Sequence, residues 1–277
     1  MYGLYAYPGA KGIDSLHYVE LMKYKDDSGQ PITRFVETCF GAGNVVATAS
    51  TYPTRITNEL NTDIYRLAKM ICTKDYQMDV LQQLLCMEIT KEQFQKCKDQ
   101  LGKTTDNEVY YCACVWFVHL FSFNGRGEQW SEASLNKKLL TDSRLNSLDL
   151  YKGIEVKNKD MLDLLNEEKK QPELMAKTMY FLDPPYMNNN VKYKENEAAK
   201  REFHLELVEL LKGIPYVMLC GYDNDVYNKH LCEELGYYKY CMGEKKLSAN
   251  VVAKNSIRKT NKEYIWTSYP VKGVYLQ

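Results

Sequence analysis

The chain has 277 residues, with 36 basic and 36 acidic side chains and a hydrophobic fraction of 45%. This balance is typical of a soluble globular protein with one large or two modest domains, and no apolar run approaches the length of a membrane span. The first twelve residues show no signal-peptide pattern, so we expect a cytoplasmic protein.

Nine cysteines are scattered along the chain, at positions 39, 72, 86, 97, 112, 114, 220, 232 and 241. Their number is odd and they contain no Cys-x-x-Cys pair, which disfavours both a disulfide framework and a zinc site. We therefore expect buried free thiols in a reducing compartment, and no metal.

The first elements in chain order alternate between strand and helix. Residues 34–39 (RFVETC) predict a buried strand, which runs into the glycine loop 40–43 and a helix over 44–50. Residues 56–60 predict the next strand, and Asn61 is placed to cap a helix whose apolar residues recur at helical spacing. This strand–helix order indicates a parallel sheet.

From about residue 75 to 153 the pattern indicates helices and loops. The capping box 90–93 predicts a helix that ends at Gly102, and Asp106 is a candidate cap for a second, strongly apolar helix over 109–120. His119 lies within that helix, where a lone histidine is more often a packed residue than a ligand. A turn-rich stretch, SFNGRGEQWSE, follows at 122–132.

Strand patterns then resume, at residues 153–157, 177–182, 216–220 and 263–268. The predicted fold is therefore an α/β, Rossmann-like sheet with helices on both faces, interrupted by a mainly helical insertion. We place the sheet domain at 1–74 and 154–277, and the inserted domain at 75–153.

Three predicted strand ends carry groups suited to a nucleoside. The glycines of the 40–43 loop allow a ligand to approach the backbone closely, and Glu59 ends the next strand, where an acid suits a ribose diol. Asp160 follows the third strand and could accept a hydrogen bond from a purine amine. Val46 stands where a dinucleotide fingerprint has its third glycine, which argues against NAD.

The most specific stretch is Asp183-Pro184-Pro185-Tyr186, directly after the predicted strand 177–182. Two successive prolines fix φ and remove two N–H donors, so the chain leaves the sheet in a stiff loop that presents one carboxylate and one aromatic ring. Such a loop could hold a planar polar group. The alternative is a rigid turn without function.

Charge is also uneven near the C-terminus. Between residues 245 and 262 there are six basic side chains and no acid: Lys245, Lys246, Lys254, Arg258, Lys259 and Lys262. The stretch is either an ordinary solvated surface or a strip that contacts phosphates.

Together these motifs resemble the D12 class (Dam-like) adenine-N6 DNA methyltransferases, over nearly the whole chain. The order of the matching segments is that of the family: YPGAKG at 7–12, FVETCFGAGNV at 35–45, NELNTD at 58–63, SFNGRGEQW at 122–130, DPPY at 183–186 and the basic segment 255–270. Tyr7 and Pro8 replace the usual tryptophan and alanine. QWSE at 129–132 departs from the family's hairpin, so no target sequence can be carried over.

The resemblance implies the reaction and its site. It implies S-adenosylmethionine as cofactor, double-stranded DNA as substrate and a flipped-out adenine whose amine contacts Asp183 and the Pro184 carbonyl while Tyr186 stacks on the base. The implied catalytic residues are Asp183, Pro184, Pro185 and Tyr186. The implied cofactor residues are Tyr7, Lys11, Phe40, Gly41, Ala42, Gly43, Asn44, Glu59, Leu60, Asp160 and Asp183. The expected DNA contacts are Phe123, Asn124, Arg126, Lys254, Arg258 and Lys259.

Several alternatives stay open at this stage. Within the methyltransferases they are an RNA adenine or a DNA cytosine-N4 enzyme. Outside this class they are a nucleotide-binding dehydrogenase and a catalytically silent DNA-binding relative. A cognate restriction endonuclease is also open as a partner, and the resemblance implies neither a membrane nor a metal.

Overall fold

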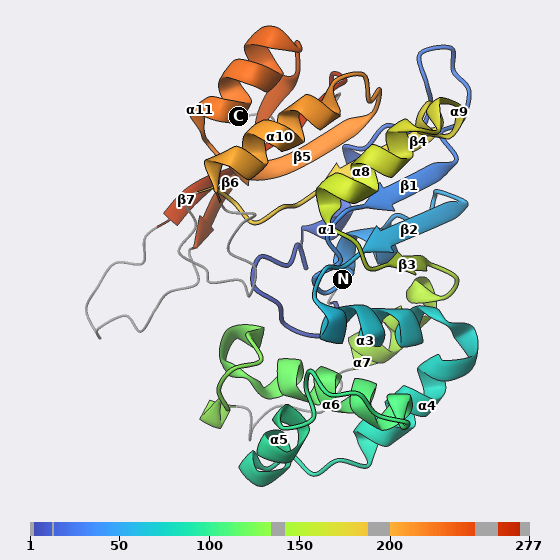
Figure 1. The fold of residues 1–277 in the computed structure, drawn as a ribbon, viewed down its shortest axis with the longest axis vertical. Coiled ribbons are helices and arrows are strands. Elements are labelled where there is room, and N and C mark those ends of the chain that lie inside the picture. The colour runs from blue at the N-terminus through green and yellow to red at the C-terminus, as the bar shows by residue number, and fades with distance from the viewer. Residues whose placement is uncertain (1–2, 13, 134–141, 188–199, 247–259, 272–277) are drawn as a thin grey trace. The chain divides into compact units, whose positions relative to one another are not determined.

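The computed structural model describes residues 3–12, 14–133, 142–187, 200–246 and 260–271 (Figure 1). In the first part of the chain the elements are α1 (Ser15–Glu20), β1 (Arg34–Glu37), α2 (Asn44–Thr48), β2 (Thr54–Asn58), α3 (Thr62–Cys72), α4 (Lys74–Leu85), α5 (Lys91–Lys98), α6 (Glu108–Phe121) and the 3-10 turn η1 (Phe123–Gly125). In the second part they are α7 (Asp142–Ser147), the 3-10 turn η3 (Leu148–Tyr151), β3 (Glu155–Lys157), α8 (Met161–Lys169), α9 (Pro172–Met175), β4 (Thr178–Leu182), α10 (Arg201–Leu211), β5 (Val217–Tyr222), α11 (Asp225–Tyr227), the π-helical segment η5 (Asn228–Glu234), β6 (Tyr238–Lys246) and β7 (Thr260–Thr267).

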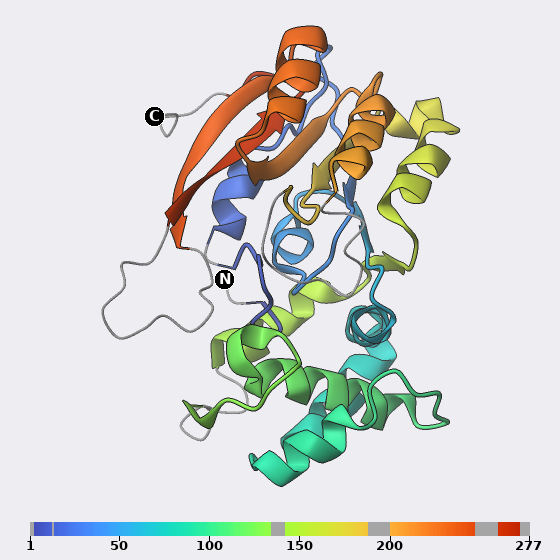
Figure 2. The same ribbon diagram turned by 60° about the vertical axis from the view of Figure 1, so that its left-hand side comes forward.

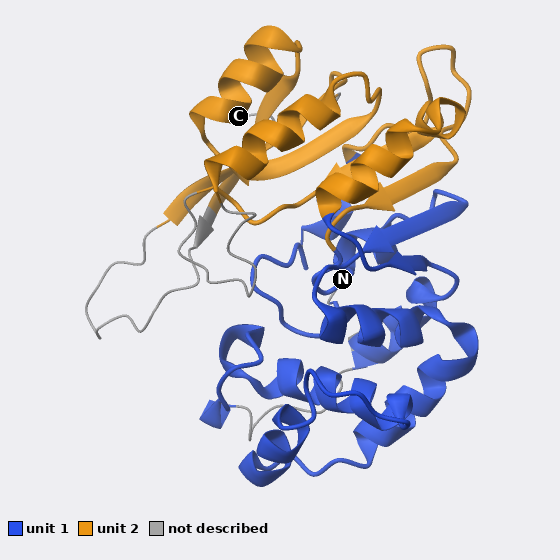
Figure 3. Cartoon of the chain, in the orientation of Figure 1, with its two compact units in different colours: residues 1–20, 40–160 blue, residues 21–39, 161–277 orange. Residues whose placement is uncertain are grey.

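The chain divides into two compact units, each made of two stretches of sequence (Figure 3). Unit 1 contains residues 1–20 and 40–160, and unit 2 contains residues 21–39 and 161–277. Unit 1 holds β2 and β3 with helices α1 to α7, and unit 2 holds the other five strands with helices α8 to α11.

The strands form a seven-stranded sheet in the order β3-β2-β1-β4-β5-β7-β6. The β1–β4, β4–β5 and β2–β3 pairs are parallel, as the alternation of strand and helix predicted. The expectation of a parallel sheet is wrong at one edge, because β7 pairs antiparallel with both β5 and β6.

The antiparallel edge contains a strand that the sequence analysis missed. Strand β6, nine residues long, pairs with β7 in the hairpin drawn in orange and red in Figures 1 and 2. Its sequence, YKYCMGEKK, mixes aromatic and charged residues without a continuous apolar run, because an edge strand packs less of its surface than a central one.

The central strands of unit 2 are buried along their whole length, which explains their nearly continuous apolar sequences. Arg34 and Glu37 on β1 are exceptions, and the Arg34 guanidinium pairs with the buried carboxylate of Glu168 on α8 at 2.8 Å. The hydroxyl of Tyr180 on β4 donates to the same carboxylate at 2.9 Å. The buried charges of Arg34 and Glu168 are therefore paired and hydrogen-bonded, as burial in a low-dielectric interior demands.

In unit 1, helices α3, α5 and α6 begin at polar side-chain caps. Asn61 caps α3 as predicted, because its side chain accepts from the backbone N–H groups of Asp63 and Ile64. Thr90 likewise accepts from the Gln93 N–H at the start of α5. The cap predicted for α6 is wrong by one position: Asn107, and not Asp106, accepts from the Tyr110 N–H. Helix α5 also ends at Lys98, earlier than the predicted Gly102.

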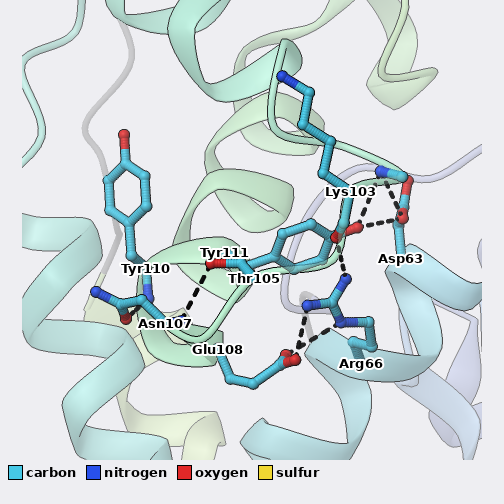
Figure 4. Close-up of polar contacts among 9 residues, drawn as sticks. Asp63, Arg66, Lys103, Thr105, Asn107, Glu108, Tyr110 and Tyr111 are labelled. Carbon is cyan, nitrogen blue, oxygen red and sulfur yellow. Dashed lines mark hydrogen bonds and ion pairs between the residues drawn. The ribbon is translucent and has the colours of Figure 1, made fainter.

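Gly102 instead belongs to a polar cluster that joins α3 to α6 (Figure 4). The Tyr111 hydroxyl and the Gly102 N–H both donate to the buried carboxylate of Asp63. Arg66 forms a bidentate pair with Glu108 at 2.7 and 3.0 Å, and its guanidinium lies 3.4 Å from the centre of the Tyr111 ring. Burial first, and the hydrogen bond to Asp63 next, raise the pKa of Tyr111 to about 12, so it stays a donor.

The described part of the structure bears on the presence of disulfides, metal sites and membrane-spanning helices. The nine cysteines, all within the described part of the chain, form no disulfide. Among the described residues, no group of three or more His, Cys, Asp or Glu side chains is arranged to hold a metal ion. Across the described ranges, no helix has both the length and the apolar character needed to span a bilayer.

Candidate active site

The glycine loop of unit 1 is a tight turn that only glycine suits. Gly41 and Gly43 have φ values of +53° and +68°, and the Gly43 N–H closes the turn onto the Phe40 carbonyl at 2.6 Å. A Cβ on Gly43 would lie 2.4 Å from the Phe40 ring and 2.7 Å from Tyr151. A Cβ on Gly41 would lie 3.2 Å from the Tyr7 ring, so Tyr7 packs against this loop.

Two tyrosine hydroxyls hold the carbonyls of the same loop. Tyr5 donates to the Gly41 carbonyl at 2.6 Å, and Tyr151 donates to the Ala42 carbonyl at 3.2 Å. Burial is the main cause that raises the pKa of Tyr5 well above its ordinary value, so the Tyr5 hydroxyl remains a neutral donor. The sequence analysis missed both tyrosines, because nothing in their spacing links them to the loop.

Glu59 lies beside the glycine loop, as its position at the end of β2 predicted. The side chain is buried, at 8% exposure, and its two oxygens accept from the backbone N–H groups of Gly41 at 3.1 Å and Asn61 at 2.9 Å. These two donors fix the carboxylate against the loop. A carboxylate can accept about four hydrogen bonds, so a group held in this way has the chemistry to receive further donors such as a ribose diol.

The end of β3 is clamped to the end of β2 by two asparagine amides. Asn58 exchanges hydrogen bonds with the Lys159 backbone at 2.9 and 3.0 Å, and the Asn158 amide donates to the carbonyls of Glu59 and Leu60 at 2.6 and 3.1 Å. The clamp brings the segment that carries the half-buried Asp160 next to the segment that carries Glu59. Neither asparagine was among the predicted site residues.

The other predicted cofactor residues differ in how deeply they are buried. Lys11 is buried, and its ammonium group lies 3.3 Å from the Gly9 carbonyl and 5.9 Å from the Tyr18 ring centre. Asn44 is buried at the start of α2, and the Leu60 side chain is 38% exposed.

The catalytic loop predicted from DPPY lies in unit 2, directly after the buried strand β4. Asp183 is half-buried and Tyr186 is 9% exposed. The Tyr186 hydroxyl lies 3.0 Å from Asp183 Oδ1 and also forms a hydrogen bond with the buried Glu263 of β7. The Tyr222 and Tyr186 rings form a T-shaped pair, with centroids 4.7 Å apart and ring planes at 78°. The loop is thus held by its own prolines and by contacts with β5 and β7.

The sequence model of one protein family, described as D12 class N6 adenine-specific DNA methyltransferase, matches residues 21–249 of the chain. The chain belongs to this family. It is therefore an adenine-specific DNA methyltransferase, an enzyme that methylates the N6 amine of adenine in DNA. No curated protein matches the chain.

The turn predicted to contact DNA is built onto helix α6 of the methyltransferase. Phe123 is 47% exposed, and Asn124 adopts a left-handed conformation with φ of 54°. The Phe123 N–H donates to the Gln129 carbonyl at 2.8 Å, and His119 Nδ1 lies 2.8 Å from the Gly125 carbonyl. His119 is thus a packed residue, as expected, and it supports the turn. Arg126 is half-buried.

The three other predicted DNA contacts, Lys254, Arg258 and Lys259, lie outside the described residues. Glu263 of the methyltransferase is the main site residue that the sequence analysis missed. An acid at the start of a predicted strand, EYIWTS, was the available signal, and the structure shows that this carboxylate is buried and so needs a partner.

Proposed function

We propose that this methyltransferase uses S-adenosylmethionine to methylate an adenine that it has flipped out of duplex DNA. The observation that carries the proposal is the Asp183–Tyr186 loop, which presents a half-buried carboxylate and a proline carbonyl at the end of a buried strand. The exocyclic amine of adenine is a poor nucleophile because its lone pair is delocalised into the ring. It needs two acceptors, one for each hydrogen, to become more tetrahedral.

In this proposal Asp183 accepts one amine hydrogen and the Pro184 carbonyl accepts the other. Proline suits the second role because its ring fixes φ, the following Pro185 restricts ψ and hence the direction of the carbonyl, and no N–H of its own is present. Tyr186 packs against the base. As positive charge develops on the amine nitrogen, the Asp183 carboxylate stabilises it, an effect of positioning and electrostatics. An adenine within the duplex is stacked and paired and cannot present its amine to this loop, so it must leave the duplex.

The residues of unit 1 fit a nucleoside that carries no phosphates. The glycine loop is a tight turn with little room for a Cβ at Gly41 or Gly43, Glu59 offers a fixed carboxylate, and Asp160 lies on the segment clamped beside it. We propose that Glu59 receives the ribose diol and that Asp160 receives the purine amine. When bound, S-adenosylmethionine supplies a methyl group that its sulfonium has already activated.

We further propose that residues 75–153 form a target-recognition domain and that residues 1–74 and 154–277 form the catalytic domain. The exposed Phe123 and Asn124 and the adjacent Arg126 are the proposed groove contacts, since amide and guanidinium groups read base edges. Lys254, Arg258 and Lys259 are the proposed phosphate contacts.

The test is single-turnover methylation of adenine-containing duplexes with labelled S-adenosylmethionine, followed by digestion and detection of N6-methyl-deoxyadenosine. Asp183→Ala is expected to lower the rate by about 10²–10³ or more, because the acceptor for the amine and for its developing charge is lost. Asp183→Asn should retain more activity, since its amide oxygen still accepts.

DNA affinity of both variants should stay within a few-fold of the parent, because neither change touches the proposed DNA contacts. If Asp183→Ala methylates DNA at close to the parental rate, the loop is a rigid turn and the proposed catalytic role is wrong.

A further inference from the structure

A second acid, Glu263, contacts the last residue of the Asp183–Tyr186 loop. It lies on β7 with 4% exposure, directly across from Tyr222 on β5 in the antiparallel register. Tyr222 is also the residue whose ring packs against Tyr186 in a T-shaped arrangement. The β5–β7 pair therefore forms the wall against which the last residue of the loop packs. Burial of an ionised carboxylate is costly unless a donor compensates it.

The Tyr186 hydroxyl is a donor to Glu263, and a second carboxylate, that of Asp183, also lies within hydrogen-bond distance of this hydroxyl. Its oxygen forms a hydrogen bond with Glu263 Oε1 and lies 3.0 Å from Asp183 Oδ1. A phenol carries one hydrogen, so it can donate to one of the two carboxylates at a time. Glu263 is buried whereas Asp183 is half-buried, so Glu263 has less water from which to accept a hydrogen bond and gains more from this donor.

The direction of this one hydrogen matters for Asp183. A hydrogen bond from Tyr186 would occupy a lone pair of the Asp183 carboxylate and draw off part of its negative charge. The carboxylate would then be a weaker acceptor for the amine and a weaker stabiliser of the charge that develops on it. When the hydroxyl hydrogen points to Glu263, the Asp183 carboxylate does not lose acceptor strength to Tyr186.

We propose, resting on the catalytic role proposed for Asp183, that Glu263 is a positioning residue of this reaction. It takes the hydroxyl hydrogen of Tyr186 and so keeps the Asp183 carboxylate as an acceptor for the target amine. Glu263 acts through Tyr186.

The test is a pair of variants and their combination, measured by single-turnover rate, kcat and KM for DNA. In Glu263→Gln the acceptor is neutral, so the Tyr186 hydrogen turns to the charged Asp183. We expect kcat to fall on the order of 10- to 100-fold, as for other groups that orient a catalytic side chain, with KM within a few-fold of the parent.

The combination is the decisive variant. Tyr186→Phe keeps the aromatic face but removes the hydroxyl that would be turned onto Asp183. Glu263→Gln combined with Tyr186→Phe should therefore be faster than Glu263→Gln alone and within a few-fold of Tyr186→Phe. This recovery, unlike a general loss of stability, requires that Glu263 act through the hydroxyl.

Glu244→Gln is the matched control, because Glu244 is an exposed acid on β6 of the same hairpin and its change removes the same charge. It should leave kcat unchanged. Thermal melts and S-adenosylhomocysteine binding of each variant report folding. If Glu263→Gln does not fold, the double variant takes its place, because it buries no unpaired charge. Its kcat is then compared with that of Tyr186→Phe. Values of kcat more than a few-fold apart overturn the proposal.

Two other results overturn it. The first is a kcat of Glu263→Gln equal to that of the parent. The second is a double variant that is slower than Glu263→Gln, because the losses of the Glu263 carboxylate and the Tyr186 hydroxyl then add. Either result, together with an inactive Asp183→Ala, removes the role of Glu263 and leaves the proposed function standing. A fully active Asp183→Ala removes the proposed function itself.

Discussion

At the scale of single residues, the best-defined group in unit 1 is the carboxylate of Glu59. Two backbone N–H groups, from Gly41 and Asn61, hold it at the side of the glycine loop. Side chains held by the backbone are preorganised, so a ligand that they bind need not order them. Glu59 is thereby both a proposed ligand contact and a support for the loop.

Replacing Glu59 should weaken cofactor binding. Glu59→Ala is expected to cost about 1.5–3 kcal/mol of affinity for S-adenosylhomocysteine, the range for a hydrogen bond to a charged group. Glu59→Gln should lose less, since one oxygen remains. Titration calorimetry measures both. The control is Glu155→Ala, an exposed acid on the neighbouring strand β3, and equal affinities for the parent and Glu59→Ala would contradict the assignment.

At the scale of elements, the turn that follows α6 is packed against the N-terminal segment of unit 1. Gly125 has φ of +70°, and a Cβ there would stand 1.9 Å from the Ala6 carbonyl oxygen. The His119 ring lies 5.1 Å from Tyr5 and 6.0 Å from Tyr7, between centroids. Within unit 1, the proposed DNA-contacting turn and the aromatic residues beside the glycine loop therefore form one packed group.

This packing makes a prediction with a matched control. Gly125→Ala and Gly102→Ala both place an alanine at positive φ, which costs roughly 1–3 kcal/mol in each case. A Cβ at Gly102 meets nothing within 4 Å, whereas a Cβ at Gly125 must displace the turn from the Ala6 backbone. Urea unfolding should show the larger loss of stability for Gly125→Ala, and the methylation rate should fall for that variant alone. Equal losses would mean that the turn moves freely away from Ala6.

At the scale of the whole molecule, a buried histidine links stability to pH. His204 on α10 is 1% exposed, and its Nδ1 lies 2.6 Å from the Tyr227 hydroxyl. Burial lowers the pKa of His204 to about 4, while the Pro185 backbone opposes this effect by raising it. The unfolded chain has an ordinary histidine pKa of about 6.5 and therefore binds more protons than the folded chain between pH 6.5 and 4. Stability that is complete above pH 6.5 is thus lost as the pH falls toward 4.

The resulting prediction concerns the difference between two pH values. From pH 7 to pH 5, the parent should lose about 2 kcal/mol more unfolding free energy than His204→Asn, which cannot be protonated in this range. Asparagine keeps an acceptor for the Tyr227 hydroxyl. Urea unfolding of both proteins at both pH values measures this difference. The contributions of other titrating groups cancel because they are the same in the two proteins. If both proteins lose the same free energy, His204 does not contribute to the acid sensitivity.

Much of the candidate site followed from local sequence. Asp183-Pro184-Pro185-Tyr186 predicted a stiff loop because proline restricts its own φ and the residue before it, whatever surrounds them. The glycine loop and Asn61 were likewise predicted, because positive φ and helix caps are decided within a few residues. Buried parallel strands were recognised because both of their faces must be apolar.

Tertiary structure alone decided what these local pieces touch. Strand β6 was missed because an edge strand in a hairpin carries no continuous apolar signal, and Asn107 displaced Asp106 as a cap because two adjacent polar residues compete on backbone geometry. The partnership of Glu263 with Tyr186 joins residues 77 positions apart and depends on the register of β5 against β7. Hydrogen bonds act over about 3 Å, so such contacts exist only once the sheet has brought distant segments together.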